Sequence, residues 1–182
     1  MMENQAVKEF RSIAIKWGII SGLVSILYTI LLYVIDAKLL ASGTWTSLSM
    51  VFIITFIVLS VKEFKLTQEG YINLSEALFT GFFTFVIGSL ISALFGYVLM
   101  NFIDTNLPII IKDTVIENAI AMMQKFGASE DDITKALVSL NEQDYGVTLK
   151  RVGLNFLGTS AFGFVLSFII AAIMKKQRPV FE

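Results

Sequence analysis

Four long, uncharged apolar stretches constrain this chain more than any other feature of its sequence. They cover residues 17–35, 45–61, 77–103 and 152–174, and none of them contains Asp, Glu, Lys or Arg. A helix needs about 20 consecutive, mostly apolar residues to cross the hydrocarbon core of a bilayer. The four stretches therefore predict four transmembrane helices, and we expect an all-α, polytopic membrane protein.

The composition of the whole chain favours a membrane protein over a soluble core of four helices. The chain has 182 residues, of which 55% are hydrophobic and 16% are charged, and its mean hydropathy is +0.75. A soluble domain usually carries about 25% charged residues. The first stretch has 19 apolar residues and no A-x-A site, so we do not expect a cleaved signal peptide. The length predicts one membrane domain over residues 1–182.

The residue types that are missing exclude several kinds of chemistry. The sequence contains no Cys and no His, which removes thiolate chemistry, Cys/His zinc sites and His-dependent acid–base catalysis. No ionisable residue lies within the four stretches, which disfavours proton- or cation-coupled transport. The net charge of -1 gives no indication of nucleic-acid binding. We therefore expect no catalytic residue, no cofactor, no metal and no enzymatic activity.

The distribution of basic residues predicts the orientation in the membrane. An even number of spans places both termini on one side. Residues 1–16, 62–76 and 175–182 carry eight bases in 39 positions, whereas residues 36–44 and 104–151 carry six in 57. Basic residues concentrate on the cytoplasmic side, so we expect both termini in the cytoplasm and an extracytoplasmic insert. The last two bases of that insert adjoin the fourth stretch and oppose this orientation.

The insert at residues 104–151 is predicted to contain two short amphipathic helices. The first covers residues 113–126 and ends before Gly127, while Ser129, with Asp132 three residues later, starts a second that runs to about residue 140. The two apolar faces comprise Val115, Ile116, Ala119, Ile120, Met123 and Phe126, and Ile133, Ala136, Leu137 and Leu140. We expect a small hairpin on the membrane face. The acids at 130–132 either complement the helix dipole or hold a cation.

The connection between the second and third stretches carries a helix stop and a helix start. Lys62 and Lys65 follow the second stretch and are expected to anchor it at the membrane surface, and Gly70 breaks the chain. Asn73 is expected to cap the third helix, with Glu76 reaching back as in a capping box. This pattern predicts a structural turn rather than a binding site.

Small residues recur at four-residue steps within the first, third and fourth stretches. They are Gly18 and Gly22, then Gly88, Ser92 and Gly96, and finally Gly163 and Ser167. Small residues at this spacing let helix backbones approach closely in lipid. Three interpretations are open, namely packing within a four-helix bundle, an interface with a partner or a second copy, and a groove for a lipid or polyprenyl chain.

Several of these residues together resemble a known family. The resemblance rests on the Gly18-x-x-x-Gly22 motif, Lys62 and Lys65, Gly70-Tyr71-Ile72, Glu76-Ala77, Gly81, FIDTNLP at 102–108 and AAIMKKQRP at 171–179. Over nearly its whole length the chain resembles the bacterial integral-membrane family called domain of unknown function 4199. The resemblance implies a four-span protein of the bacterial cytoplasmic membrane. It implies no catalytic residues, because the family has no assigned activity.

The abundance of packing surface and the lack of reactive groups favour one function over three others. We expect a non-enzymatic accessory or scaffold subunit that contacts lipid and binds another integral membrane protein or a second copy of itself. A small lipid or small-molecule transporter or channel is one alternative, and a companion subunit of a membrane glycosyltransferase acting on a lipid-linked sugar is another. A membrane enzyme would need Glu69, Glu76 and Asp104 to converge on one face.

Overall fold

The computed structural model of the protein describes residues 2–143 and 145–177, with side chains from residue 9 onwards. Residues 178–179 of the C-terminal motif lie outside this range. The long helices are α1 (Met2–Ile35), α2 (Gly43–Thr67), α3 (Leu74–Val98) and α6 (Leu149–Met174). The described residues contain no strand, so the predicted all-α class is confirmed.

Four helices are long and apolar enough to cross a membrane, as predicted. The candidate spans are Glu9–Ile35, Gly43–Thr67, Leu74–Ile103 and Leu149–Met174. Each helix continues past its uncharged stretch into charged flanking residues, because backbone hydrogen bonding does not stop where hydrophobicity does. The third span changes to a π-helix over Leu99–Ile103, where the Asp104 amide donates to the Leu99 carbonyl at 2.8 Å.

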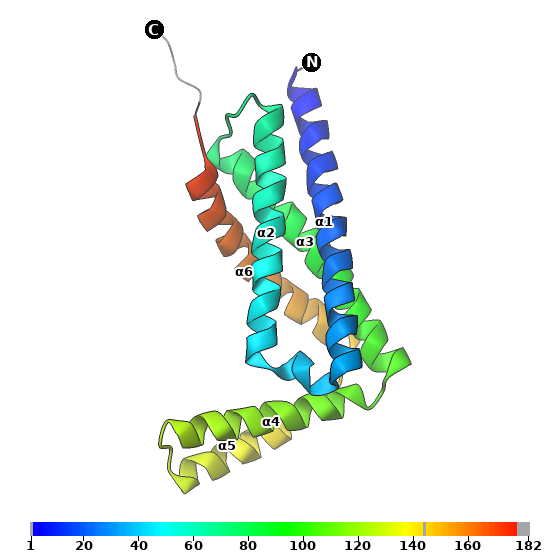
Figure 1. Cartoon of the computed structure of the whole chain (residues 1–182), viewed down its shortest axis with the longest axis vertical. Coiled ribbons are helices and arrows are strands. Elements are labelled where there is room, and N and C mark those ends of the chain that lie inside the picture. Colours follow the sequence, from blue (N-terminus) through cyan, green and yellow to red (C-terminus); the bar gives the residue numbers. More distant parts are fainter. Residues whose placement is uncertain (1, 144, 178–182) are drawn as a thin grey trace.

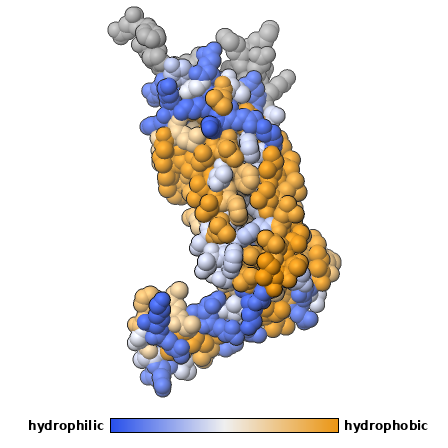
Figure 2. Space-filling model, viewed as in Figure 1, coloured by the Kyte–Doolittle hydropathy of each residue, from blue (hydrophilic) through white to orange (hydrophobic). Residues whose placement is uncertain are grey.

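The four long helices form a bundle with two different ends (Figure 1). α1 and α2 run side by side, and α3 and α6 run obliquely to them. The N-terminus and the end of α6 lie at one end, which we call the terminal end. The short 3-10 helix η1 (Ala37–Ala41) and the polar insert lie at the other, which we call the insert end. Figure 2 shows an apolar band between two polar ends, as a membrane-spanning bundle requires.

The insert folds into a helical hairpin that lies across the insert end of the bundle (Figure 1). It consists of α4 (Leu107–Lys125) and α5 (Glu130–Glu142), and we call residues 107–142 the arm. α4 begins six residues before its predicted start, because Pro108 occupies the first turn, where a missing amide proton costs nothing. The predicted apolar faces are half-buried apart from Phe126, which is 81% exposed.

The buried core of the bundle lies towards the terminal end. Its members come from all four long helices and the turn before α3, and they include Ile13, Ile57, Val61, Phe64, Ile72, Ala77, Phe85, Ile170 and Ala171. In contrast, α2 has no buried residue before Ile57, and α6 has none before Gly163. Helices that cross obliquely separate with distance from their crossing point. The bundle is therefore closed at the terminal end and splayed at the insert end.

Candidate functional site

An ion-pair cluster joins α1 to α2 near the terminal end. The Lys16 ammonium lies 2.6 Å from both carboxylate oxygens of Glu63, and the Trp17 indole N–H donates to Glu63 Oε2 at 2.7 Å. The same ammonium lies 5.1 Å from the centre of the Trp17 ring. Sequence reasoning missed Glu63. The signal that could have found it was a carboxylate just after one apolar stretch and a Lys-Trp pair at the start of another.

The connection between α2 and α3 ties the end of α6 to the bundle. Lys65, predicted as a membrane anchor, donates through Nζ to the Met174 carbonyl at 2.8 Å, and so satisfies an end carbonyl of α6. Ile72 and Lys176 exchange two backbone hydrogen bonds of 2.9 Å. The predicted breaker Gly70 has a left-handed φ of 84°, and Glu69 before it is left-handed as well, with φ of 58°.

The residues predicted to cap helices do so in the structure. The Glu76 amide donates to the Asn73 side chain at 2.8 Å, and the Asn73 amide donates to Glu76 Oε2 at 3.0 Å, which makes a reciprocal capping box. Ser129 accepts from the Asp132 amide at the start of α5. These residues act as local structural supports and line none of the cavities described below.

Most of the predicted small residues are covered within the chain. A Cβ added at Gly18 would lie 2.6 Å from Ile87 Cβ, and one at Gly22 would lie 2.7 Å from Ile91 Cβ.

On α3, a Cβ at Gly88 would lie 3.0 Å from the Ser21 hydroxyl, and one at Gly163 of α6 would overlap the Phe85 ring. Ser167 is 1% exposed and lies opposite Gly81. Five of the seven predicted packing positions therefore serve contacts between α1, α3 and α6.

Gly96 and Ser92 differ from the other five. A Cβ at Gly96 would meet no atom within 4 Å, so this glycine does not bring two helices together in this chain. Gly96 instead lines a cavity in the splayed half of the bundle, and Ser92 lines a cavity nearer the middle of the bundle, which Gly88 also lines. The regular four-residue spacing on α3 gave no sign of this difference, because it depends on where the neighbouring helices diverge.

The innermost of these cavities lies in the middle of the bundle and is rich in hydroxyl groups. The inner cavity has a volume of about 220 Å³. Its polar lining consists of Ser21, Ser25, Thr84, Ser89, Ser92 and Thr159, and Ile53, Ile57 and Phe85 are among its apolar residues. The Thr84 and Ser89 hydroxyls donate to carbonyls of their own helix, at Thr80 and Val86. A hydroxyl bound in this way keeps its acceptor lone pairs.

A second cavity continues the first towards the insert end between α3 and α6. The middle cavity has a volume of about 300 Å³ and shares Ser89 and Thr159 with the inner cavity. Its other lining residues are mostly apolar or small and include Ala93, Gly96, Met100, Val152 and Phe156.

Two larger cavities open at the insert end, and we call them together the mouth. They have volumes of about 590 and 450 Å³ and share Met100, Pro108, Gln143, Tyr145 and Val147. Met100, Val147, Val152 and Asn155 also link the mouth to the middle cavity. We call the inner cavity, the middle cavity and the mouth together the groove.

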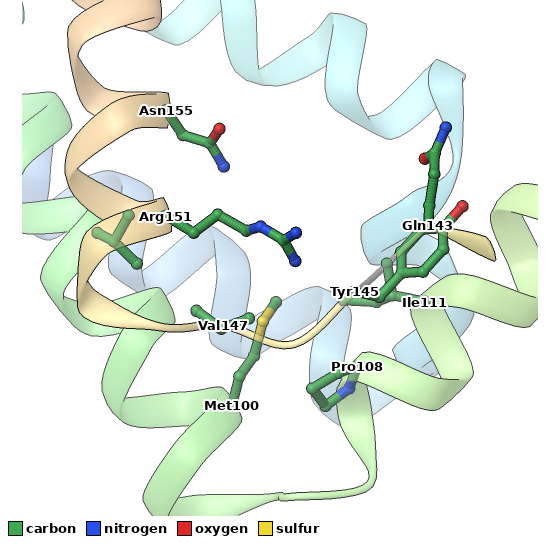
Figure 3. Close-up of a pocket in the computed structure, with 9 residues that line it drawn as sticks. Met100, Pro108, Ile111, Gln143, Tyr145, Val147, Arg151 and Asn155 are labelled. Carbon is green, nitrogen blue, oxygen red and sulfur yellow. The ribbon is translucent and has the colours of Figure 1, made fainter. Parts of the chain in front are cut away.

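The mouth carries the charged groups of the groove. Figure 3 shows Arg151 and Asn155 projecting into the cavity from α6, opposite Gln143 and Tyr145. Lys112 of α4 lines the adjoining part of the mouth. Arg151 Nη1 donates to the Gly146 carbonyl at 2.9 Å, and Lys112 Nζ donates to the Asn141 carbonyl at 3.2 Å. Polarity therefore falls along the groove, from cations at the mouth to hydroxyl and apolar groups inside.

The carboxylates considered for an enzymatic site do not converge. Glu69 and Glu76 flank the turn before α3, whereas Asp104 follows the far end of the same span and accepts a hydrogen bond of 3.0 Å from the Tyr33 hydroxyl. No group of three or more acidic side chains in the described ranges is placed to hold a metal ion, and that includes the acids at 130–132.

Comparison with known proteins identifies the family. A family model described as "Protein of unknown function (DUF4199)" matches residues 16–176. The chain belongs to this family. The predicted resemblance is therefore confirmed, although the DUF4199 description assigns no activity. No curated protein and no solved structure matches the chain. The DUF4199 match includes every residue named above as lining the groove, so the groove lies wholly within the family domain.

Proposed function

We propose that this multi-pass membrane protein is a non-enzymatic lipid-binding protein that holds a lipid chain in its groove. The observation that carries the proposal is the continuity of the groove from the middle of the bundle to the insert end. Most of the groove lies in the half in which α2 before Ile57 and α6 before Gly163 bury no residue. An acyl or prenyl chain can therefore reach it from the surrounding bilayer.

The change in polarity along the groove supports an amphiphile over a fully polar ligand. The middle cavity is lined by residues such as Ala93, Val152 and Phe156, while the mouth has Arg151 and Asn155. Binding sites for small molecules are mostly apolar, with a few polar groups that fix the orientation of the ligand. A ligand with an apolar chain and a polar headgroup matches both parts.

The test uses a substitution that fills the middle cavity of the groove without disturbing the packed half of the bundle. Gly96→Leu adds a side chain where a Cβ meets no atom, so the fold is retained and the middle cavity is occupied. Gly158→Leu is the matched control, because Gly158 is equally open and lines none of the four cavities. Native mass spectrometry in mild detergent measures binding of oleoyl lysophospholipids to each variant.

We expect Gly96→Leu to lose lipid binding and Gly158→Leu to retain it, with both variants folded by circular dichroism. Equal lipid binding by the two variants would overturn the proposed function. A Gly→Leu change in a helix also gains helix propensity, by about 0.8–1.0 kcal/mol at most. A stability loss large enough to explain lost binding is therefore not expected.

We also propose that the termini are cytoplasmic and that the mouth faces the outer side of a bacterial cytoplasmic membrane. The higher density of basic residues in the connections at the terminal end supports this orientation. The chain contains no Cys, so single-cysteine variants can be labelled without background. In intact cells, a membrane-impermeant maleimide should label Lys125→Cys in the arm but not Lys62→Cys. The reverse pattern would overturn the orientation.

The arm favours a second candidate function, as an accessory subunit for another membrane protein. The arm projects sideways beyond the bundle in Figure 1, and Met122, Phe126 and Val138 are all more than half exposed on it. Affinity purification at native expression, followed by mass spectrometry, tests this role. A partner recovered with the unaltered chain but lost with Phe126→Ser would support it, and recovery of the chain alone from several mild detergents would count against it.

A further inference from the structure

We infer that the groove selects a lipid whose chain carries a hydroxyl group, and that the inner cavity binds this hydroxyl. The inference rests on the proposed lipid-binding function and names the class of chain that the groove takes. It is carried by the hydroxyl side chains that line the inner cavity and by the lack of a charged residue among the described residues there.

The inner cavity is polar although it lies in the middle of an apolar bundle. All four long helices contribute to its wall, and six of the ten described residues that line it are Ser or Thr. The middle cavity, by contrast, is lined mostly by apolar or small residues. A lipid chain that extends inwards from the mouth therefore passes apolar walls first and meets hydroxyl groups at its inner part.

Most of these hydroxyls are not used by the protein itself. Ser and Thr within a helix often donate to a carbonyl of the preceding turn, as Thr84 and Ser89 do here. The other four make no hydrogen bond within the part of the chain that the structure describes, and they are Ser21, Ser25, Ser92 and Thr159. A shielded hydroxyl without a partner is costly, so an acceptor inside the cavity would stabilise this arrangement.

The Ser21 hydroxyl shows how the wall leaves room for a ligand atom. Ser21 is 6% exposed, so its hydroxyl is almost fully shielded from the surroundings of the bundle. A Cβ at Gly88 would lie 3.0 Å from this hydroxyl oxygen, and Gly88 lines the same cavity. The glycine therefore leaves the oxygen uncovered on the side of α3.

The chemistry of the wall indicates an uncharged group that both accepts and donates. No Asp, Glu, Lys or Arg lines the inner cavity among the described residues, and a buried ion without a counter-charge costs far more than a buried hydroxyl. The four hydroxyls without a partner can donate, whereas Thr84 and Ser89 have only lone pairs to offer. A hydroxyl group satisfies both kinds of neighbour, and a ketone or ester carbonyl satisfies only the first.

The depth of the inner cavity places the hydroxyl in the lipid chain rather than in the headgroup. Ser92 lies eight residues before Met100, which lines the mouth from the same span. This separation is about 12 Å along the helix axis. A headgroup at the mouth therefore stops short of the inner cavity, and a carbon near the middle of a long acyl chain reaches it.

Native mass spectrometry of the full chain in mild detergent measures selection among three lysophosphatidylcholines. The first carries an oleoyl chain, and the second carries a ricinoleoyl chain, which is the same chain with one hydroxyl near its middle. The third carries an oleoyl chain with a hydroxyl beside the carbonyl carbon. We expect the ricinoleoyl lipid to bind about fivefold more tightly than the oleoyl lipid, as one net hydrogen bond gives. The third lipid should bind like the oleoyl lipid, because its hydroxyl stays near the mouth.

The test variant removes the four hydroxyls without a partner, by Ser→Ala and Thr→Val changes at Ser21, Ser25, Ser92 and Thr159. It should bind the oleoyl and ricinoleoyl lipids equally while keeping the fold by circular dichroism. Ser92→Ala combined with Thr159→Val is a milder variant and should reduce the preference at least about twofold. The matched control makes the same changes at four α2 hydroxyls that donate to nearby carbonyls and line none of the cavities, namely Thr46, Ser47, Ser49 and Thr55.

Each outcome bears on one of the two proposals. Equal binding of the oleoyl and ricinoleoyl lipids by the unaltered protein overturns the hydroxyl site and leaves lipid binding intact, and it is the result expected if ordered water alone fills the cavity. An unchanged preference in the fourfold variant, or in the milder variant if the fourfold variant does not fold, also overturns the site. Equal preference for the third lipid overturns its location in the inner cavity. If Gly96→Leu binds the oleoyl lipid as the unaltered chain does, the lipid-binding groove itself is overturned.

Discussion

The two halves of this bundle are both apolar but pack differently (Figure 2). Towards the terminal end, α6 buries Gly163, Ser167, Ile170 and Ala171 against α3 and its neighbours, whereas its first 14 residues bury none. On α3 the buried residues end at Gly88 within the α-helical part. The difference does not arise from hydrophobicity, because both halves are apolar (Figure 2).

The difference follows from what lies opposite each glycine. Ile87, Ile91 and Phe85 fill the space left by Gly18, Gly22 and Gly163, so each of these pairs joins two helices. In the splayed half, Gly96 has no such partner and opens a cavity instead. In lipid, helix association depends on van der Waals packing rather than on a hydrophobic driving force. A glycine therefore stabilises the bundle only where a larger side chain faces it.

The largest expected effect comes from adding one methyl group in each half. Gly163→Ala places a Cβ 2.1 Å from Phe85 Cδ1, and we expect a loss of about 2–3 kcal/mol in the free energy of unfolding because the packed half cannot relax freely. Gly158→Ala on the same helix meets no atom and should stabilise by up to about 0.5–1 kcal/mol. Equilibrium unfolding in mixed micelles measures both, and equal effects would contradict the division into two halves.

Removing one ion pair from each end gives the next contrast. Glu63→Gln removes the carboxylate that accepts hydrogen bonds from both Lys16 and Trp17 at the terminal end. We expect the free energy of unfolding to fall by about 1.5 kcal/mol. Glu117→Gln removes only the 3.7 Å pair with Lys38 between two well-exposed side chains, and should change stability by less than about 0.5 kcal/mol. Thermal unfolding at low and high salt checks both values, and a larger loss at Glu117 would reverse the contrast.

The effect of removing a helix cap on the stability of the bundle should also depend on the region in which the helix lies. Asn73→Ala removes the capping box of α3, the helix that contacts α1, α2 and α6, and should cost about 1 kcal/mol in global unfolding. Ser129→Ala removes the cap of α5 in the arm, and should leave the melting temperature of the bundle unchanged. An unchanged melting temperature in Asn73→Ala would contradict a stabilising cap.

The smallest expected effect concerns the exposed tip of the arm. Phe126→Ser replaces a side chain that is 81% exposed, so bundle stability should change by less than about 0.5 kcal/mol. Circular dichroism during thermal unfolding measures this change. A large loss would show that the arm is part of the cooperative unit of the bundle.

The fold could be predicted from the sequence where the signal is local. Apolar length marks each span, Asn73 and Glu76 stand three residues apart as a cap requires, and Gly127 stops α4. The errors at the edges of helices have the same origin. α4 starts early because a first-turn Pro108 is compatible with a helix, and Phe126 is exposed because the helix ends before it can turn inward.

The candidate site could not be predicted from the sequence because it depends on crossing geometry. Gly88 and Gly96 look alike on α3, but only the first meets another helix. Arg151 and Lys112 are 39 positions apart in the sequence, and they line adjoining cavities of the mouth only because α6 and the arm meet at the insert end. The Lys16–Glu63 pair was missed for the same reason, since its members lie on different helices.

The closed packing beneath the inner cavity has a consequence for how a lipid would exchange. Val61 and Phe64 are 0% and 2% exposed and lie in the packed core at the terminal end, so the groove is a blind pocket rather than a passage. A lipid must enter and leave on the same side. If the proposed lipid binding holds, the protein in this conformation would sample a single leaflet, and its occupancy would report the concentration of its ligand in that leaflet alone.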